Sequence, residues 1–218
     1  MTESKAWNWA DAEKERWLVP SEECVYLAEK WKGEGAETLL DLGCGLGRHT
    51  LYFAEKGFSV SALDLSSEAV TATAALLTAH GFQPDCREGD MVCLPYPENS
   101  FDRIFSYRVI SHQDTKGVAQ VIREIARVLK PGGRIFVTLC SKAHAAWQDP
   151  DFPRVDENTL LKTEGAEVNV PHFFADKALL RTLFRDFRLL SVRHVTDCDM
   201  DRDGGEKCHY HIEAAVEK

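Results

Sequence analysis

Several features that mark other classes of protein are missing from this 218-residue sequence. It has no run of about 18 apolar residues, which excludes a transmembrane helix. The first 17 residues lack the apolar segment of a secretory signal peptide. The seven cysteines form no Cys-x-x-Cys pair, and an odd number of scattered thiols makes no disulfide framework. We therefore expect a cytoplasmic protein with no membrane partner.

The sequence also has fewer positively charged than negatively charged residues. Lys and Arg number 26 against 35 Asp and Glu, which gives a formal net charge of −9. A surface of that sign repels a phosphate backbone, so we expect no nucleic-acid partner. The hydrophobic and charged fractions, 44% and 28%, are ordinary for a globular protein and exclude collagen-like and disordered classes. We expect one domain, as a monomer or a homodimer.

From Thr38 onward, short apolar strands alternate with helices. The predicted strands cover residues 38–42, 58–63, 83–88, 101–106 and 134–139. The clearest helix precedes the fifth strand, has its apolar residues on one stripe at a period of 3.6, and ends at Pro131. Serial βα units predict an α/β fold with a doubly wound, mostly parallel sheet. The carboxyl ends of its strands should meet at one edge, where such sheets bind ligands.

A glycine-rich loop follows the first predicted strand, in the run Asp41-Leu42-Gly43-Cys44-Gly45-Leu46-Gly47. Glycines let the backbone turn sharply and approach a ligand closely. The G-x-G-x-G spacing differs from the G-x-G-x-x-G of dinucleotide-binding loops, and Asp41 puts negative charge beside the place of a pyrophosphate. The loop therefore favours a cationic ligand. An NAD-dependent oxidoreductase is the less favoured alternative, and a tight turn without a ligand is another.

Acidic residues follow the next two predicted strands. Asp64 ends the second strand, where a carboxylate can accept hydrogen bonds from ribose hydroxyls. Helix capping is the alternative role for Asp64. Asp90 follows the third strand, where it can accept from an adenine amino group while Met91 covers the ring. Together with Asp41, these residues predict a site with several acceptors of hydrogen bonds.

Four segments appear in a characteristic order: TLLDLGCGLGRHT (38–50), SALDLS (61–66), EGDMVCLPYPENSFDRIFS (88–106) and REIARVLKPGGRIFVTL (123–139). In combination they resemble the class I S-adenosylmethionine-dependent methyltransferases. The resemblance implies a Rossmann-like, seven-stranded sheet with an antiparallel last strand, and S-adenosyl-L-methionine as the cofactor. The cofactor-binding residues that it implies are Asp41, Gly43, Cys44, Gly45, Gly47, Asp64, Leu65, Asp90, Met91 and Ser106. Residues 41–64 are also similar to the small tellurite-resistance methyltransferases.

The resemblance implies one methyltransferase domain over residues 1–218. Its expected parts are an N-terminal arm and helix (1–33), a cofactor-binding core (34–140), a lid (141–175), and a C-terminal helix and hairpin (176–218). The arm carries Trp7, Trp9 and Trp17. Long segments without periodicity are usually functional, so the lid should close over the site. We expect Trp147 and Phe152 among the aromatic walls.

The sequence after the fourth strand bears on the methyl acceptor. It reads Ser106-Tyr107-Arg108-Val109, unlike the [ND]-P-P-[YF] run of the family's amide and nucleobase N-methyltransferases. With the acidic charge, this favours a small-molecule acceptor. Transfer by in-line displacement requires mainly alignment and exclusion of water. His112, Tyr107 and His172 are the candidate catalytic residues. A non-catalytic S-adenosylmethionine-binding or interaction protein is the alternative to an enzyme.

Two histidines near the end of the sequence need a separate interpretation. In a strand, His209 and His211 would share one face. A metal pair or a substrate clamp is one possible role. We favour a solvated strand face and expect no metal site.

Overall fold

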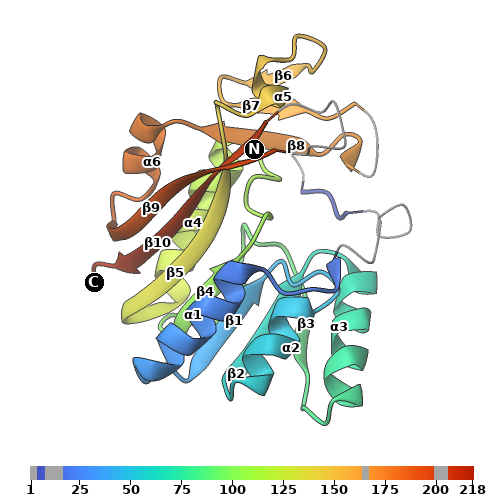
Figure 1. Ribbon diagram of the computed structural model, residues 1–218, viewed down its shortest axis with the longest axis vertical. Coiled ribbons are helices and arrows are strands. Elements are labelled where there is room, and N and C mark those ends of the chain that lie inside the picture. The colour runs from blue at the N-terminus through green and yellow to red at the C-terminus, as the bar shows by residue number, and fades with distance from the viewer. Residues whose placement is uncertain (1–3, 8–16, 164–166, 199–205) are drawn as a thin grey trace.

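The computed structural model describes residues 4–7, 17–163, 167–198 and 206–218. Helices and strands alternate along most of the chain (Figure 1). In chain order they are α1 (Glu22–Gly33), β1 (Thr38–Leu42), α2 (Arg48–Glu55), β2 (Ser59–Asp64), α3 (Ser67–Ala79), β3 (Asp85–Glu88), β4 (Phe101–Ser106), α4 (Thr115–Val128), β5 (Leu129–Ser141), α5 (Ala145–Gln148), β6 (Arg154–Asp156), β7 (Thr159–Leu161), β8 (Pro171–Ala175), α6 (Lys177–Leu183), β9 (Phe187–Asp197) and β10 (Lys207–Val216).

Short polar side chains begin the helices. The Ser21 hydroxyl accepts a hydrogen bond from the backbone N–H of Cys24 at the start of α1. Ser66 and Asp114 accept in the same way from the third residue after them, at the starts of α3 and α4. Each cap satisfies a backbone donor that the first helical turn leaves without a partner. These residues therefore fix where the loops between strands and helices end.

Seven strands form the main sheet, in the order β3-β2-β1-β4-β5-β10-β9. The pairs β1–β2, β2–β3, β1–β4 and β4–β5 are parallel. Strand β10 runs antiparallel to both of its neighbours, β5 and β9. This confirms the predicted Rossmann-like, mostly parallel sheet with an antiparallel last strand. Residues 199–205, which connect the two strands of the expected C-terminal hairpin, lie outside the described residues.

Side chains that alternate along the central strands fill the two faces of the sheet. Leu40 and Ile104 belong to one apolar cluster with residues of α4 and α6. Their neighbours Leu39 and Phe105 belong to a second cluster, with residues of α1 and α2. All four side chains are fully buried. Strands that are apolar on both sides are typical of a sheet covered by helices on both faces, as the doubly wound fold predicts.

The segment expected to be a lid without regular structure has strands of its own. Strand β5 pairs with β4 up to Val137, and beyond that point Cys140 pairs with Phe174 of β8. Strand β8 then pairs with β7, and β7 with β6. The sheet is thereby extended past the carboxyl end of β4, and Figure 1 shows β6, β7 and α5 at the top of the molecule. This extension closes one side of the crevice.

Two local expectations were wrong. We expected Pro131 to end the helix and the next strand to begin at residue 134. Instead, β5 already begins at Leu129, which pairs with Phe101. The proline and the glycines after it occupy a shift in the β4–β5 register. His209 and His211 are not on a solvated face: their side chains are buried, His209 beside His144 and His211 against Glu23 of α1.

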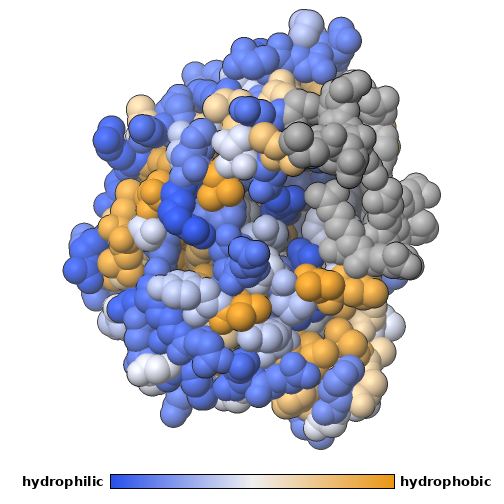
Figure 2. Space-filling view, in the orientation of Figure 1, coloured by the Kyte–Doolittle hydropathy of each residue, from blue (hydrophilic) through white to orange (hydrophobic). Residues whose placement is uncertain are grey.

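Strand β9 forms the other edge of the main sheet. Leu189, Leu190 and Val192 are exposed along it, and apolar residues gather over β9 and α6 in Figure 2. No helix among the described residues combines the length and apolar character needed to cross a membrane.

Candidate functional site

One cavity of about 640 Å³ lies at the carboxyl ends of the parallel strands. Residues from the loops after β1, β2, β3, β4 and β5 all line it, which confirms that these loops meet at one edge. The lining also includes residues of the arm, of the segment between β7 and β8, and of β10. The residues predicted from the sequence that line this cavity are Gly43, Cys44, Gly45, Asp64, Leu65, Asp90, Met91, Tyr107, His112 and His172.

The glycine loop after β1 packs tightly against two other elements. The backbone N–H groups of Gly43 and Cys44 donate to the Leu63 carbonyl oxygen of β2, at 2.7 and 3.1 Å. Gly43 has a φ of +78°, and a Cβ there would lie 2.4 Å from the Val109 methyl groups. Only glycine suits this combination of left-handed backbone and close contact. The loop is therefore held open to the cavity by its neighbours.

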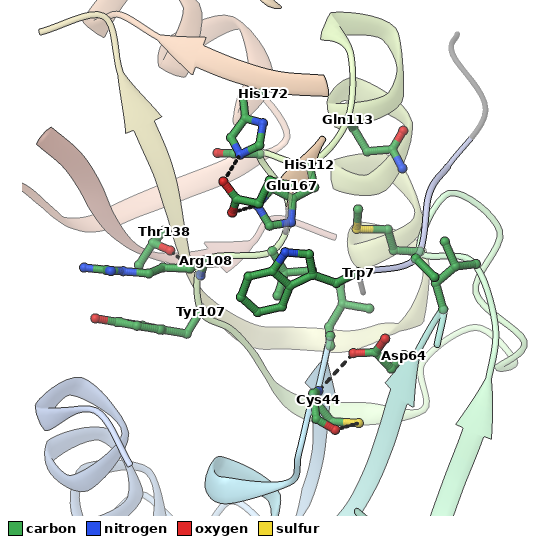
Figure 3. Close-up of a pocket in the computed structure, with 18 of the residues that line it drawn as sticks. Trp7, Cys44, Asp64, Tyr107, Arg108, His112, Gln113, Thr138, Glu167 and His172 are labelled. Carbon is green, nitrogen blue, oxygen red and sulfur yellow. Dashed lines mark hydrogen bonds and ion pairs between the residues drawn. The ribbon is translucent and has the colours of Figure 1, made fainter. Parts of the chain in front are cut away.

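Asp64 lies at the end of β2, facing the glycine loop (Figure 3). Its Oδ2 accepts from the backbone N–H of Gly45 at 2.9 Å, and its Oδ1 accepts from that of Ser66 at 2.9 Å. Burial raises the pKa of this carboxyl above its usual value, although both backbone hydrogen bonds oppose that shift. Each oxygen keeps acceptor capacity for a ligand hydroxyl.

Asp90 and Met91 continue the same wall after β3. The Oδ1 of Asp90 accepts a hydrogen bond from the backbone N–H of Val92 at 3.0 Å, in a tight turn. Both side chains are half-buried and line the cavity. Two carboxylates and a thioether thus line the cavity together with the glycine loop.

Three residues that the sequence placed in the site are not part of its described lining. Asp41 is 1% exposed, and its Oδ2 accepts from the Thr50 hydroxyl of α2 at 2.6 Å. Burial raises the pKa of Asp41 to about 7. The buried Ser106 hydroxyl donates to the Leu42 carbonyl oxygen at 2.9 Å, and Gly47 contacts Thr73. These residues lie beneath the loop and support it.

A cluster of titratable side chains forms the opposite wall, which we call the His–Glu–His cluster (His112, Glu167 and His172). The Nε2 of His112 lies 3.6 Å from Oε1 of Glu167, and the Nε2 of His172 lies 3.2 Å from Oε2. The imidazole rings are 4.9 Å apart. Figure 3 shows the three side chains converging. The two predicted catalytic histidines are thus brought together, by a glutamate that no sequence motif indicated.

The environment sets the charges of this cluster. Burial lowers the pKa of His112 to about 4, and the nearby His172 adds to the shift. Burial alone would raise the pKa of Glu167, but the hydrogen bond and charge of His172, with the charges of His112 and Lys162, lower it to about 2. Near neutral pH, His112 is therefore neutral and Glu167 is an anion.

Tyr107 and Arg108 follow β4 on a third side of the cavity. Burial raises the pKa of Tyr107, so its phenol stays protonated at neutral pH. Arg108 has a φ of +60°, unusual for a residue with a side chain. Its backbone N–H donates to the Thr138 hydroxyl at 2.7 Å, and its guanidinium donates to Asp197 at 2.7 Å. These bonds hold the strained turn in place.

The arm covers part of the cavity. Trp7 and Trp17 both line it, with ring centroids 4.9 Å apart in an edge-to-face arrangement. The Trp7 ring lies 6.4 Å from that of His112, and in Figure 3 it lies between the His–Glu–His cluster and Asp64. The side chain of Gln113 donates to the Ser4 hydroxyl at 2.7 Å. Trp9 lies outside the described residues.

The lid segment contributes polar groups and one aromatic ring, Phe174, to the cavity lining. His144, Lys162 and Glu167 are among the residues that line the cavity. Trp147 instead packs on Phe174, with ring centroids 5.3 Å apart, and Phe152 lies under Lys162. Neither ring is among the described residues of the lining, so the expectation was wrong for both. Both rings instead pack against other residues of the lid segment.

The two histidines of β10 have different environments. His209 lines the cavity beside His144, with ring centroids 5.7 Å apart, and burial lowers its pKa to about 3. His211 lies beyond the cavity wall, where its Nδ1 is 2.8 Å from Oε1 of Glu23 in α1. They face different partners, so they do not form a metal pair.

Comparison with known proteins agrees with this arrangement of loops. Residues 40–137 match the family model of the methyltransferase domain. These residues therefore form a methyltransferase domain. Over 137 residues it is 35% identical to malonyl-[acyl-carrier protein] O-methyltransferase from Erwinia billingiae (strain Eb661), covering 61% of this chain and 51% of that protein. The chain spans about half, or less, of the length of the curated relatives it matches, at 51%, 40% and 22%.

Solved structures share the fold of this methyltransferase domain. A SAM-dependent methyltransferase from Methanosarcina mazei superposes with a TM-score of 0.70 at 23% identity, covering 83% of this chain and 92% of that one. The 1,6-didemethyltoxoflavin-N1-methyltransferase of Burkholderia thailandensis, solved with 1,6-didemethyltoxoflavin and S-adenosylhomocysteine, superposes with a TM-score of 0.64 at 21% identity. This superposition covers 94% of this chain and 82% of the Burkholderia protein.

The donor and acceptor groups of the methyltransferase domain suit its cofactor class. S-adenosylmethionine carries a sulfonium, an ammonium and two ribose hydroxyls, and no phosphate. Asp64 and Asp90 offer carboxylate oxygens to such donors, and the glycine loop presents its backbone to the ligand. Negative charge on this wall stabilises a cationic ligand and disfavours a pyrophosphate.

Proposed function

We propose that this chain is an enzyme that transfers the methyl group of S-adenosylmethionine to a small-molecule acceptor by in-line displacement. One observation carries the proposal. A single cavity joins the loops after β1, β2 and β3 to a separate wall made by the arm and the His–Glu–His cluster. Its volume of about 640 Å³ lies within the range of small-molecule sites, roughly 300–1,000 Å³. The cofactor and a small acceptor can therefore share one enclosed space.

The first wall is suited to the cofactor. Each oxygen of Asp64 accepts one backbone N–H and keeps a lone pair for a ribose hydroxyl. We assign the adenine to Asp90 and Met91, and the methionine portion to the backbone of Gly43 and Gly45. Bound S-adenosylmethionine supplies an electrophilic methyl group on its sulfonium. The contribution of the chain is to hold that group at a fixed place and direction.

The second wall is suited to the acceptor. Trp7 and Trp17 give it an apolar surface, and the His–Glu–His cluster gives it a polar end. Displacement requires the nucleophilic atom within about 3–3.5 Å of the methyl carbon, in line with the leaving sulfur. An acceptor held between rings and a polar anchor has few other orientations, and the arm keeps water out. His112, which is neutral near pH 7, is the candidate to take a proton from it.

Two similar proteins bear on the size of the acceptor. The Burkholderia neighbour was solved with a small molecule and S-adenosylhomocysteine together. The Erwinia relative is named for an acceptor on acyl-carrier protein, which is a larger substrate. In this chain, the arm and the β6–β8 extension both cover the cavity, and that favours an acceptor small enough to be enclosed.

Calorimetry and a turnover assay test the proposal together. We expect saturable binding of S-adenosylmethionine and S-adenosylhomocysteine, and none of NAD. A metabolite panel that includes hydroxyl, amine and thiol acceptors should then give release of S-adenosylhomocysteine with at least one compound. Binding without turnover on any small molecule would favour the non-catalytic alternative. Binding of NAD alone would favour an oxidoreductase.

A further inference from the structure

The spacing of the His–Glu–His cluster matches that of metal ligands. One ligand atom from each of the three residues lies within 4.8 Å of the other two. The two distances to the Glu167 carboxylate are 3.6 Å from His112 and 3.2 Å from His172. Two atoms bonded to one ion at about 2.1 Å, at tetrahedral or octahedral angles, lie about 3.0–3.4 Å apart. The two distances to Glu167 are within a few tenths of an ångström of this range, and the ligand atoms of the two histidines lie within 4.8 Å of one another.

The hydrogen bonds of His172 leave a positive charge to be accounted for. Its Nδ1 lies 3.1 Å from the Val170 carbonyl oxygen, which accepts hydrogen bonds and donates none. Nδ1 therefore carries a proton, and in a neutral ring Nε2 would present a lone pair to Glu167 Oε2 at 3.2 Å. A lone pair facing a carboxylate is repulsive unless a proton or a cation lies between them. A metal-bound histidine commonly has this arrangement, with its other N–H on a backbone carbonyl.

His112 favours a cation over a proton at this place. Its Nε2 also faces Glu167. At 3.6 Å the His112–Glu167 distance is too long for a hydrogen bond. A proton on His172 would satisfy one side of the carboxylate, whereas one ion would bond all three residues. Lys162 Nζ, 4.0 Å from Oε2, offsets part of the negative charge without filling the space.

We propose that His112, Glu167 and His172 together bind one divalent transition-metal ion at the acceptor end of the cavity. Two imidazoles and one carboxylate suit Zn²⁺, Fe²⁺, Co²⁺ or Mn²⁺, and three protein ligands leave coordination positions open. This departs from the absence of a metal that we expected from the sequence. On the proposed function, the ion anchors an acceptor through oxygen. The acceptor class is then a hydroxyl or carboxylate compound that can chelate a metal.

The experiment uses the full chain without an affinity tag, stripped with a chelator. Titration with Co²⁺ is followed by visible absorption, and titration with Zn²⁺ by calorimetry. We expect one saturable equivalent, with affinity at least tenfold weaker in Glu167→Gln and in His172→Gln. His80→Gln is the matched control, because His80 is an exposed histidine at the end of α3. Binding of S-adenosylhomocysteine reports that each variant is folded.

The outcomes separate this inference from the proposed function. Absence of saturable Co²⁺ and Zn²⁺ binding in the unaltered chain would overturn it, and a protonated His172 would then explain the cluster. Binding that Glu167→Gln leaves unchanged would also overturn it, since the ion would lie elsewhere. If the unaltered chain binds the metal but does not bind S-adenosylhomocysteine, the result would count against the methyl-transfer proposal alone.

Discussion

The backbone N–H of Gly45 donates to Oδ2 of Asp64 at 2.9 Å, so the glycine loop after β1 is tied to the carboxylate that ends β2. The same carboxylate is the proposed partner of the ribose hydroxyls. One side chain therefore shapes the loop and offers its remaining lone pairs to the ligand.

Asp64→Ala should weaken binding of S-adenosylmethionine by about 1.5–3 kcal/mol, because the hydroxyls lose a charged acceptor. Calorimetry measures the change, and a thermal melt reports the fold. Asp151→Asn is the control, since Asp151 is an exposed carboxylate in the β6–β8 extension. Unchanged affinity in a folded Asp64→Ala variant would remove this residue from the site.

Gly43→Ala should destabilise the chain and abolish cofactor binding. Its Cβ would lie 2.4 Å from the Val109 side chain, at a φ of +78°. Gly132→Ala provides the matched control, because Gly132 has a φ of +72° with nothing within 4 Å of its Cβ. The control isolates backbone strain, about 1–2 kcal/mol. Denaturant unfolding should show a larger loss for Gly43→Ala, partly restored by Val109→Ala. Equal losses at the two glycines would show that the Val109 contact is unimportant.

His49 should make the fold sensitive to acid. Its ring is buried, its Nε2 accepts from the Ser21 N–H at 3.2 Å, and burial lowers its pKa to about 3. In the unfolded chain the pKa is about 6.5, so the unfolded state binds more protons between these values. The stabilisation is thus complete above about pH 6.5 and lost as pH falls. From pH 7.5 to 5, the unaltered chain should lose about 2 kcal/mol more than His49→Gln in denaturant unfolding. Parallel losses would contradict the assignment.

Trp7→Ala should separate turnover from cofactor binding. The Trp7 ring packs on Trp17 and lies beside His112, on the acceptor side of the cavity. We expect S-adenosylmethionine affinity to change by less than about tenfold and kcat/KM to fall by more, because alignment and exclusion of water are lost. Tyr26→Ala, at an exposed ring on α1, is the control. A proportional loss of both quantities would place Trp7 against the cofactor instead.

The half of the fold that holds the glycine loop was predictable because its signals are local. Strands β1, β2 and β4 carry buried apolar residues, whereas β3 (Asp85–Glu88) is polar; Asp64 ends β2, and Asp90 lies two residues after β3. In a parallel sheet, a residue just after a strand lies at one known edge. Sequence position alone therefore brought Asp64 and Asp90 to the same wall as the glycine loop.

The acceptor side was only partly predictable, because its geometry depends on pairings between distant segments. Glu167 meets His112 through the way β8 joins β5, and no residue near Glu167 signals that pairing. His209 is buried beside His144, which comes from the distant loop after β5. Alternation along a strand tells which residues share a face, but it does not tell which segments cover that face.

The position of β10 also determines when the sheet can be completed during synthesis. Strand β9 leaves the ribosome before β10, yet it pairs with β5 only through β10. Until residues 207–216 emerge from the exit tunnel, β5 keeps one unpaired edge and the exposed apolar side chains of β9 have no sheet to join. Nascent chains of this length are open to edge-to-edge association. The sheet is completed from its middle, and that step waits for the last strand to be synthesised.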